Sequence, residues 1–200
     1  MFPKPSPESP PMFDSPFVDR FSRTHWSVVP LLYGPAAALW LWIGTSYGGV
    51  GPTKTLGLFA SGLLVWTLTE YWLHRVLFHW IPQARWGERF HFLLHGVHHK
   101  WPRDRYRLVM PPAVSVTLFW VFFGLFFVAM GRYSWSFHAG FTIGYMLYDL
   151  IHYYVHHNRP QMRMMKHVRA HHLTHHAPYA KHGGKFGVST TLWDHVFRTY

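Results

Sequence analysis

The sequence contains no cysteine, and Asp and Glu together contribute only 8 of its 200 residues. Without cysteine the chain can form no disulfide, iron–sulfur cluster, thiolate-bound haem or cysteine nucleophile. Charged residues make up 14% of the chain, against about 25% in an ordinary soluble domain. The length corresponds to about one domain, and this domain has little charge with which to cover a water-facing surface.

Charged residues are nearly absent from four long stretches. A helix that crosses the hydrocarbon core of a bilayer needs about 20 predominantly apolar residues. A soluble helical bundle with stretches of this kind would leave its surface mostly apolar. The sequence therefore predicts an all-α integral membrane protein with transmembrane helices near residues 28–48, 54–74, 110–131 and 134–154.

The Lys and Arg residues are distributed unequally along these predicted spans. Seventeen of the 19 lie before the first span, between the second and third, or after the fourth. The two connections on the other side hold only Lys54 and Arg132. Cytoplasmic loops carry an excess of Lys and Arg, so we expect both termini and both large polar segments in the cytoplasm. The positive net charge therefore indicates the orientation of the chain in the membrane. No known nucleic-acid module is visible, so we expect no nucleic-acid partner.

The first 24 residues are rich in proline and begin "MFPKPSPESPPMFDSP". They lack the apolar region and the small-residue cleavage site of a signal peptide. We expect residues 1–24 to form a disordered tail and residues 25–200 to form the functional domain.

Histidine is the most unusual component, with 18 residues that lie mostly in tight clusters near the cytoplasmic ends of the second and fourth predicted spans. Residues three or four apart share one face of a helix. His74 and His79 are five apart and share a face only if the helix ends or bulges there. Two membrane helices and two peripheral helices can thus bring ten imidazoles together just outside the bilayer: His74, His79, His95, His98, His99, His152, His156, His172, His175 and His176.

Neutral imidazole is a common ligand of iron, zinc, copper and nickel. One metal ion takes about four to six ligands, so ten histidines predict a dinuclear metal site. The paired Glu-x-x-His motifs of soluble di-iron proteins are absent from this sequence. A neutral all-nitrogen ligand shell leaves a high positive charge on the metals, which favours bound hydroxide, peroxide or a substrate carbonyl oxygen.

Two acidic residues lie inside the predicted spans, Glu70 four residues before His74 and Asp149 three residues before His152. An ionisable residue inside a span is a functional candidate, and a carboxylate can orient a metal-bound imidazole. We expect both residues to support the metal ligands or to face the substrate.

Among the other histidines, His91 can join the stripe of His95, one turn away. Those that stand apart are expected to be structural or solvent-facing: His25, His138 and His182.

Together these segments resemble the integral-membrane fatty acid hydroxylase/sterol desaturase superfamily. The resemblance runs from about Arg23 to Tyr200 and rests on "EYWLHRVLFH", "LLHGVHHKWPRDRYRLVMPP", "GYMLYDLIHYYVHH", "AHHLTHH" and "FGVSTTLWD". The segments "RLVMPP" and "LYDLIHYY" are most similar to the fatty acid 2-hydroxylase branch. The resemblance implies four transmembrane helices with a cytosolic helical cap, and metal ligation by the same ten histidines.

The resemblance also implies a reaction: hydroxylation of carbon 2 of a fatty acyl chain, free or in a ceramide-type lipid, with O2 as co-substrate. The implied cofactor is a pair of iron ions, which zinc can replace in purified protein. Tyr145, Tyr148 and Asp149 match positions on the substrate side of the site, and we expect Asp149, Tyr148 and Glu70 at the catalytic centre.

No cytochrome b5 domain is recognisable in the sequence, although many members of the superfamily carry one. We therefore expect electrons to come from a separate donor, a cytochrome b5 or a ferredoxin with its reductase. The membrane expected for such an enzyme is the endoplasmic reticulum in a eukaryote and the inner membrane in a bacterium.

Three other functions fit the same residues. The first is another lipid oxidation within the superfamily, by a sterol or carotenoid hydroxylase or a desaturase. The second is metal binding or transport, although a transporter would place its ligands near the bilayer midplane rather than at the ends of spans. The third is a zinc-dependent membrane hydrolase, with Glu70 or Asp149 as general base.

Overall fold

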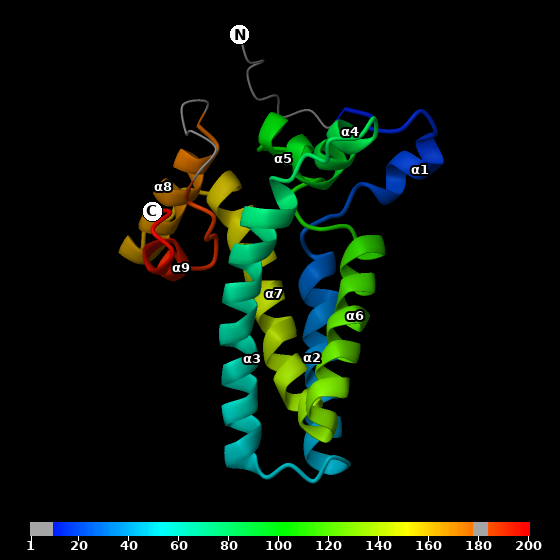
Figure 1. Cartoon of the computed structure of the whole chain (residues 1–200), viewed down its shortest axis with the longest axis vertical. Coiled ribbons are helices and arrows are strands. Elements are labelled where there is room, and N and C mark those ends of the chain that lie inside the picture. The colour runs from blue at the N-terminus through cyan, green and yellow to red at the C-terminus, as the bar shows by residue number, and fades with distance from the viewer. Residues whose placement is uncertain (1–9, 178–183) are drawn as a thin grey trace.

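The computed structural model describes residues 10–177 and 184–200, and within these ranges the chain forms helices and turns without a strand. Its shape is a long helical bundle with a cap of shorter helices at one end (Figure 1). The predicted all-α class is therefore confirmed. The C-terminus lies in the cap (Figure 1).

Four long helices build the bundle: α2 (Val28–Ser46), α3 (Pro52–Trp72), α6 (Pro112–Met130) and α7 (Ser134–His157). By length and composition, three segments of the described chain can cross a membrane, namely Val28–Ser46, Pro52–Phe78 and Pro112–His157. The last of these segments contains both α6 and α7, which are joined by the 3-10 turn Gly131–Tyr133. The apolar helices identify a membrane protein.

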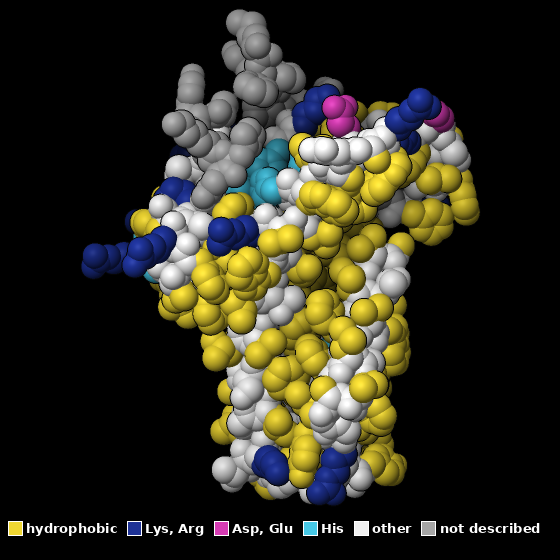
Figure 2. All heavy atoms as spheres, viewed as in Figure 1, with side chains coloured by type: hydrophobic (Ala, Val, Ile, Leu, Met, Phe, Trp, Pro, Cys, Tyr) yellow, Lys and Arg dark blue, Asp and Glu magenta, His cyan; other side chains and the backbone are white. Residues whose placement is uncertain are grey.

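The outer surface of the bundle is apolar, and Figure 2 shows hydrophobic side chains along most of its visible length. Large aliphatic side chains that are more than half exposed occur on each of three long helices: Leu31, Leu56, Leu64, Leu125 and Val128. A soluble protein rarely exposes so continuous an apolar surface. The end of the bundle away from the cap carries Lys54 and Arg132, whose charged groups both lie over the ring of Tyr133.

Helix α7 is the centre of the bundle and packs against α2, α3 and α6. Its closest neighbour is α3, and glycines on both helices make this close approach possible. A Cβ atom on Gly62 of α3 would collide with the backbone of Phe137, and one on Gly140 of α7 would collide with the backbone of Phe59. Small residues at such positions bring membrane helices into van der Waals contact along their backbones.

The cap consists of short helices at the C-terminal ends of α3 and α7 (Figure 1). Two π-helical segments belong to it, and they matter for the site described below. The cap elements are α1 (Pro16–Phe21), η1 (Leu73–Phe78), α4 (Gly87–His91), η2 (Phe92–Gly96), α5 (Val97–Lys100), α8 (Arg163–His175) and α9 (Leu192–Val196).

Part of the predicted N-terminal tail has a fixed place in the cap. Residues 1–9 lie outside the described part of the chain, whereas residues 10–24 include α1. Asp19 of α1 is buried and pairs with Arg107 at 2.8 Å and with Arg23 at 2.9 Å. This ion pair ties α1 to the loop before α6, so residues 10–24 differ from the disordered tail that we expected.

The close approach of α3 and α7 generates the first prediction. Gly140→Ala places a methyl group against the α3 backbone, and we expect a loss of about 1–3 kcal/mol, the usual cost of overpacking. Thermal unfolding of the detergent-solubilised protein measures this loss. Gly124→Ala on α6 is the matched control, because a Cβ atom there meets nothing within 4 Å. Equal stability of the two variants would contradict the proposed packing.

Candidate metal centre and lipid pocket

The π-helix at the end of α3 brings His74 and His79 together. A π-helix bonds residues five apart, and this spacing is the separation of the two histidines within and just after η1. Their ring centroids lie 5.1 Å apart in a stacked arrangement. The helix therefore bulges where the histidine spacing required it to.

The ten clustered histidines form two groups of five. In each group, every residue offers a ring nitrogen that lies within 4.8 Å of those of the other four. The first histidine group contains His74, His79, His95, His99 and His175. The second histidine group contains His98, His152, His156, His172 and His176. The groups adjoin, and the stacked rings of His99 and His176 have centroids 4.3 Å apart.

Sequence neighbours are divided between the two groups. His99 belongs to the first group and His98 to the second, and His175 and His176 are divided in the same way. Residues four apart on a helix share a face and stay together, whereas adjacent residues point about 100° apart. We expected the ten imidazoles to converge on one place, and within that convergence the structure divides each cap motif between the two groups.

The hydrogen bonds of the first group fix the direction of its lone pairs. Nδ1 of His74 lies 2.6 Å from the carbonyl oxygen of Phe186, and Nδ1 of His175 lies 3.0 Å from that of Gly184. Because a carbonyl can only accept, both Nδ1 atoms carry the proton, and each Nε2 presents a lone pair to the group. This arrangement orients a metal ligand in the usual way.

In both groups, ring nitrogens lie closer together than expected for lone pairs that face one another with no proton or cation between them. Nε2 of His95 lies 3.2 Å from Nε2 of His74 and 2.9 Å from Nε2 of His99. Nε2 of His172 likewise has Nε2 atoms of two neighbours at 2.9 and 3.1 Å. A neutral imidazole has one proton and cannot donate to two such partners. A metal cation accepts all these lone pairs, so each group can hold a metal ion.

The protonation state of the cap histidines suits metal binding. Burial lowers the pKa of His95, His98 and His172 well below the usual value, and the neighbouring imidazoles lower it further. These rings are therefore neutral at physiological pH. Neutral imidazole is the form that binds a metal ion.

Two buried carboxylates hold the loop that supplies the orienting carbonyls. Glu70 accepts hydrogen bonds from the backbone N–H groups of Val188 and Ser189, at 2.6 and 2.8 Å, and from the Ser189 hydroxyl. Asp194 accepts from the N–H groups of Phe186 and Gly187, both at 2.8 Å. The loop of residues 184–190 is thus fixed from both sides, at the place where it contacts the first histidine group.

Asp194 also pairs with His171, which lies outside both histidine groups. Nε2 of His171 is 2.9 Å from the Asp194 carboxylate, and both side chains are buried. Burial alone would raise the pKa of Asp194, but the hydrogen bonds from His171, Gly187 and Thr199 lower it below the usual value. Asp194 is a residue that sequence reasoning missed, although its motif, "FGVSTTLWD", and the scarcity of acidic residues in the chain both pointed to it.

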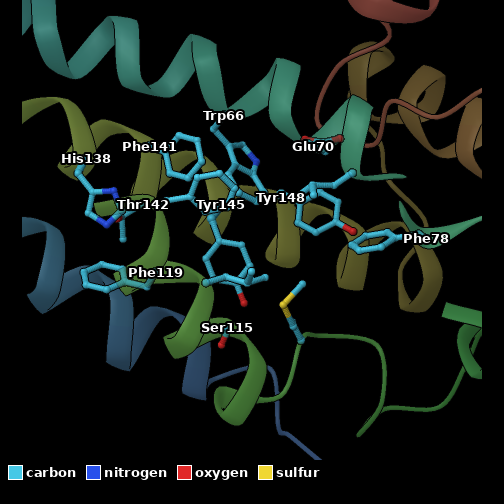
Figure 3. A pocket seen from close by; sticks show the side chains of 14 residues that line it. Trp66, Glu70, Phe78, Ser115, Phe119, His138, Phe141, Thr142, Tyr145 and Tyr148 are labelled. Atoms are coloured by element: carbon cyan, nitrogen blue, oxygen red, sulfur yellow. The ribbon is translucent and has the colours of Figure 1, made fainter. Parts of the chain in front are cut away.

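The three residues expected on the substrate side lie next to the second histidine group. The Tyr148 ring has its centroid 5.7 Å from that of His152. The Asp149 carboxylate accepts a hydrogen bond of 3.3 Å from the backbone N–H of Met110. Tyr145 lies one turn further from the histidines, and Figure 3 shows it beside Tyr148 in a pocket.

This pocket lies between α3, α6 and α7 (Figure 3). At one end are Phe78 and Tyr148, whose rings contact histidines of the two groups. Most of the other lining residues are apolar: Trp66, Leu73, Met110, Leu118, Phe119, Phe122 and Phe141. The polar ones are Glu70, Ser115, His138, Thr142 and Tyr145. A second cleft shares Phe78, Met110 and Tyr148 with it and reaches His95, His98 and His152. The pocket and the cleft together therefore connect the apolar interior of the bundle to the histidines.

The remaining histidines lie outside the two groups. His91 is near His79, with ring centroids 6.5 Å apart, but does not join the first group as its spacing suggested. His25 contacts Ser27 at the surface, and His182 lies outside the described residues. His138 is buried and lines the apolar pocket.

The sequence profile described as "Fatty acid hydroxylase" matches residues 59–199. The chain belongs to the fatty acid hydroxylase family. The π-helix, the two histidine groups and the loop that orients them all fall within the matched region.

Two relatives and one solved structure place the chain within this family. It is 39% identical, over 96% of its length and 80% of the relative's, to a dihydroceramide fatty acyl 2-hydroxylase of Arabidopsis thaliana. It is 40% identical to the ceramide very long chain fatty acid hydroxylase of Saccharomyces cerevisiae, over 96% of this chain and 50% of that protein. The visible hydroxylase domain of scs7p matches with a TM-score of 0.85 and 37% identity, over 92% of this chain and 69% of that one.

The loop contacts generate the second prediction. Asp194→Asn keeps the size of the side chain but removes its charge and one acceptor oxygen, which loosens the loop behind His74 and His175. Losing a partner of this kind costs about 10- to 100-fold in metal affinity. We expect this loss at the first histidine group, measured by elemental analysis during titration with a chelator. Asp104→Asn is the control, because Asp104 is buried but bonds Tyr106 instead of the loop. If Asp194→Asn retained metal as well as the wild-type protein does, the role of the loop in orienting His74 and His175 would be contradicted.

Proposed function

We propose that this protein hydroxylates carbon 2 of a fatty acyl chain in a ceramide-type lipid. The observation that carries the proposal is the position of the apolar pocket, one end of which is formed by side chains in contact with both histidine groups. The names of the plant and yeast relatives support the substrate class. The chain spans only about half the length of the yeast relative. The activity of that whole protein is therefore proposed, not established, for this chain.

In this proposal the two histidine groups hold two iron ions, which zinc can replace after purification. Bound iron would supply the activation of O2. One oxygen atom enters the C2–H bond as a hydroxyl group and the other leaves as water, with two electrons and two protons supplied from outside. The electrons come from a separate donor, a cytochrome b5 or a ferredoxin with its reductase.

The side chains of this protein place the substrate. The pocket holds the acyl chain and excludes water, so that carbon 2 rather than a later methylene lies at the histidines. Tyr148 and Asp149 lie where the acyl carbonyl enters, with Tyr145 one turn deeper. The oxygens of Glu70 already accept bonds from the 184–190 loop. Glu70 therefore serves as a positioning residue for the first histidine group rather than as a catalytic residue.

We propose that α2, α3, α6 and α7 each cross the membrane, which makes four spans within a hydroxylase domain of residues 25–200. The cap and both termini face the cytoplasm, because Lys54 and Arg132 are the only basic residues assigned to the opposite side. The basic cap then lies against anionic headgroups, where a cytoplasmic electron donor can reach it.

The test is expression in cells that make no 2-hydroxy lipids, followed by mass spectrometry of the hydrolysed acyl chains. We expect a 2-hydroxyacyl product that requires O2 and disappears in the double variant His95→Ala/His99→Ala. His25→Ala is the control and keeps the product, since this exposed histidine lies outside both groups.

Each rival function gives a different result in the same experiment. An unsaturated or differently hydroxylated lipid, formed with O2, identifies another oxidation of the superfamily. Metal uptake without O2 consumption identifies a metal-binding or transport protein. Lipid cleavage without O2 identifies a zinc hydrolase. Any of these, with the redox partner supplied, contradicts 2-hydroxylation.

A further inference from the structure

A buried histidine lies at the end of the apolar pocket that is away from the two histidine groups. His138 is 1% exposed, and Figure 3 shows it with Thr142 at the opposite end of the pocket from Phe78. Within the described part of the chain, neither ring nitrogen of His138 has a hydrogen-bond partner, and neither does the Thr142 hydroxyl. Buried polar groups are nearly always paired, so this end of the pocket is unusual in its polar side chains.

The neighbours of His138 are mostly aromatic and offer it no hydrogen-bond partner. The ring of His138 is surrounded by aromatic side chains, with the centroids of Phe119, Phe123 and Phe126 at 4.6, 5.5 and 5.8 Å. None of these neighbours accepts a conventional hydrogen bond, and burial without one is costly. The ring instead fills the end of the pocket, in front of the phenylalanine side chains of α6.

The position of His138 along α7 gives its distance from the histidine groups. His138 precedes His152 by 14 residues on one continuous helix, which corresponds to about 21 Å at 1.5 Å per residue. An extended acyl chain lengthens by about 1.2 Å per bond. This is a third of the length of one extended backbone residue, which contains three bonds along the chain. The distance from the histidine groups to His138 therefore accommodates about 17 bonds.

We propose that His138 forms the closed end of the acyl-chain pocket and sets the longest chain that the protein accepts, at about 18 carbons. A longer chain would drive methylene groups into the imidazole and the Thr142 hydroxyl, which they cannot hydrogen-bond, and then into the rings of Phe119 and Phe123. This inference rests on the proposed function, because it assumes that the pocket holds an acyl chain with its carbonyl end at the histidines.

The location of the chain can be tested without catalysis. The purified protein is incubated with a fatty acid of about 16 carbons that carries a diazirine next to its methyl end, illuminated, digested and analysed by mass spectrometry. We expect adducts on residues 118–126 of α6 and 137–142 of α7, which surround the closed end. Adducts confined to the cap, or to the outer surface of α2, would overturn the proposal.

The chain-length limit is tested by competition against the same probe with unlabelled saturated fatty acids of increasing length. For the wild-type protein we expect competition to weaken at least tenfold beyond about 18 carbons. His138→Ala removes the ring and should extend the limit by about two to four carbons. His138→Phe is the matched control, because it restores the bulk among aromatic neighbours and should keep the short limit. An identical profile for His138→Ala and wild type overturns the proposal.

These measurements separate the failure of this inference from the failure of the proposed function. If no 2-hydroxyacyl product forms in cells, the labelling and competition experiments still report whether the pocket takes an acyl chain and where that chain ends. If the product forms but its chain-length distribution is the same in wild type and His138→Ala, the function stands and the role of His138 is wrong.

Discussion

The structure depends on ten imidazoles directed at two small volumes. Neutral rings packed with their Nε2 atoms about 3 Å apart repel one another unless a cation lies between them, so this end of the bundle is built for a charge that the protein does not itself supply. The bulge in α3, the division of each cap motif between the groups and the loop that accepts from His74 and His175 all serve this convergence. The apolar bundle beneath it brings the C-terminal ends of α3 and α7 to the cap.

Much of the fold and the site follows from the sequence because the signals are local. Charge-free stretches predict long apolar helices, and the spacing of histidines predicts shared helix faces. The five-residue separation of His74 and His79 allows a shared face only if the helix ends or bulges there, and the structure contains the bulge. The ten histidines that were singled out are the ten that lie in the two groups.

What the sequence could not provide is contact between distant segments. Phe186 O orients His74 across 112 positions, and Glu70 binds Val188 across 118. No periodicity encodes such pairs, so the sequence indicates Glu70 as a functional residue without its loop partners and gives no role to Asp194. The sequence does not predict the position of residues 10–24 in the cap for the same reason, since that position depends on the ion pair of Asp19 with Arg107. His138 looked isolated because only the packing of α6 on α7 reveals the pocket around it.

The division of neighbouring histidines between the groups has a consequence for biosynthesis. Each group takes ligands from both the middle of the chain and residues 172–176, so neither group can be completed until nearly the whole protein has left the ribosome. The long helices of the bundle all precede that segment. The helical scaffold can therefore form before its final cap segment completes either group. Truncation after α7 would leave both groups incomplete rather than one intact.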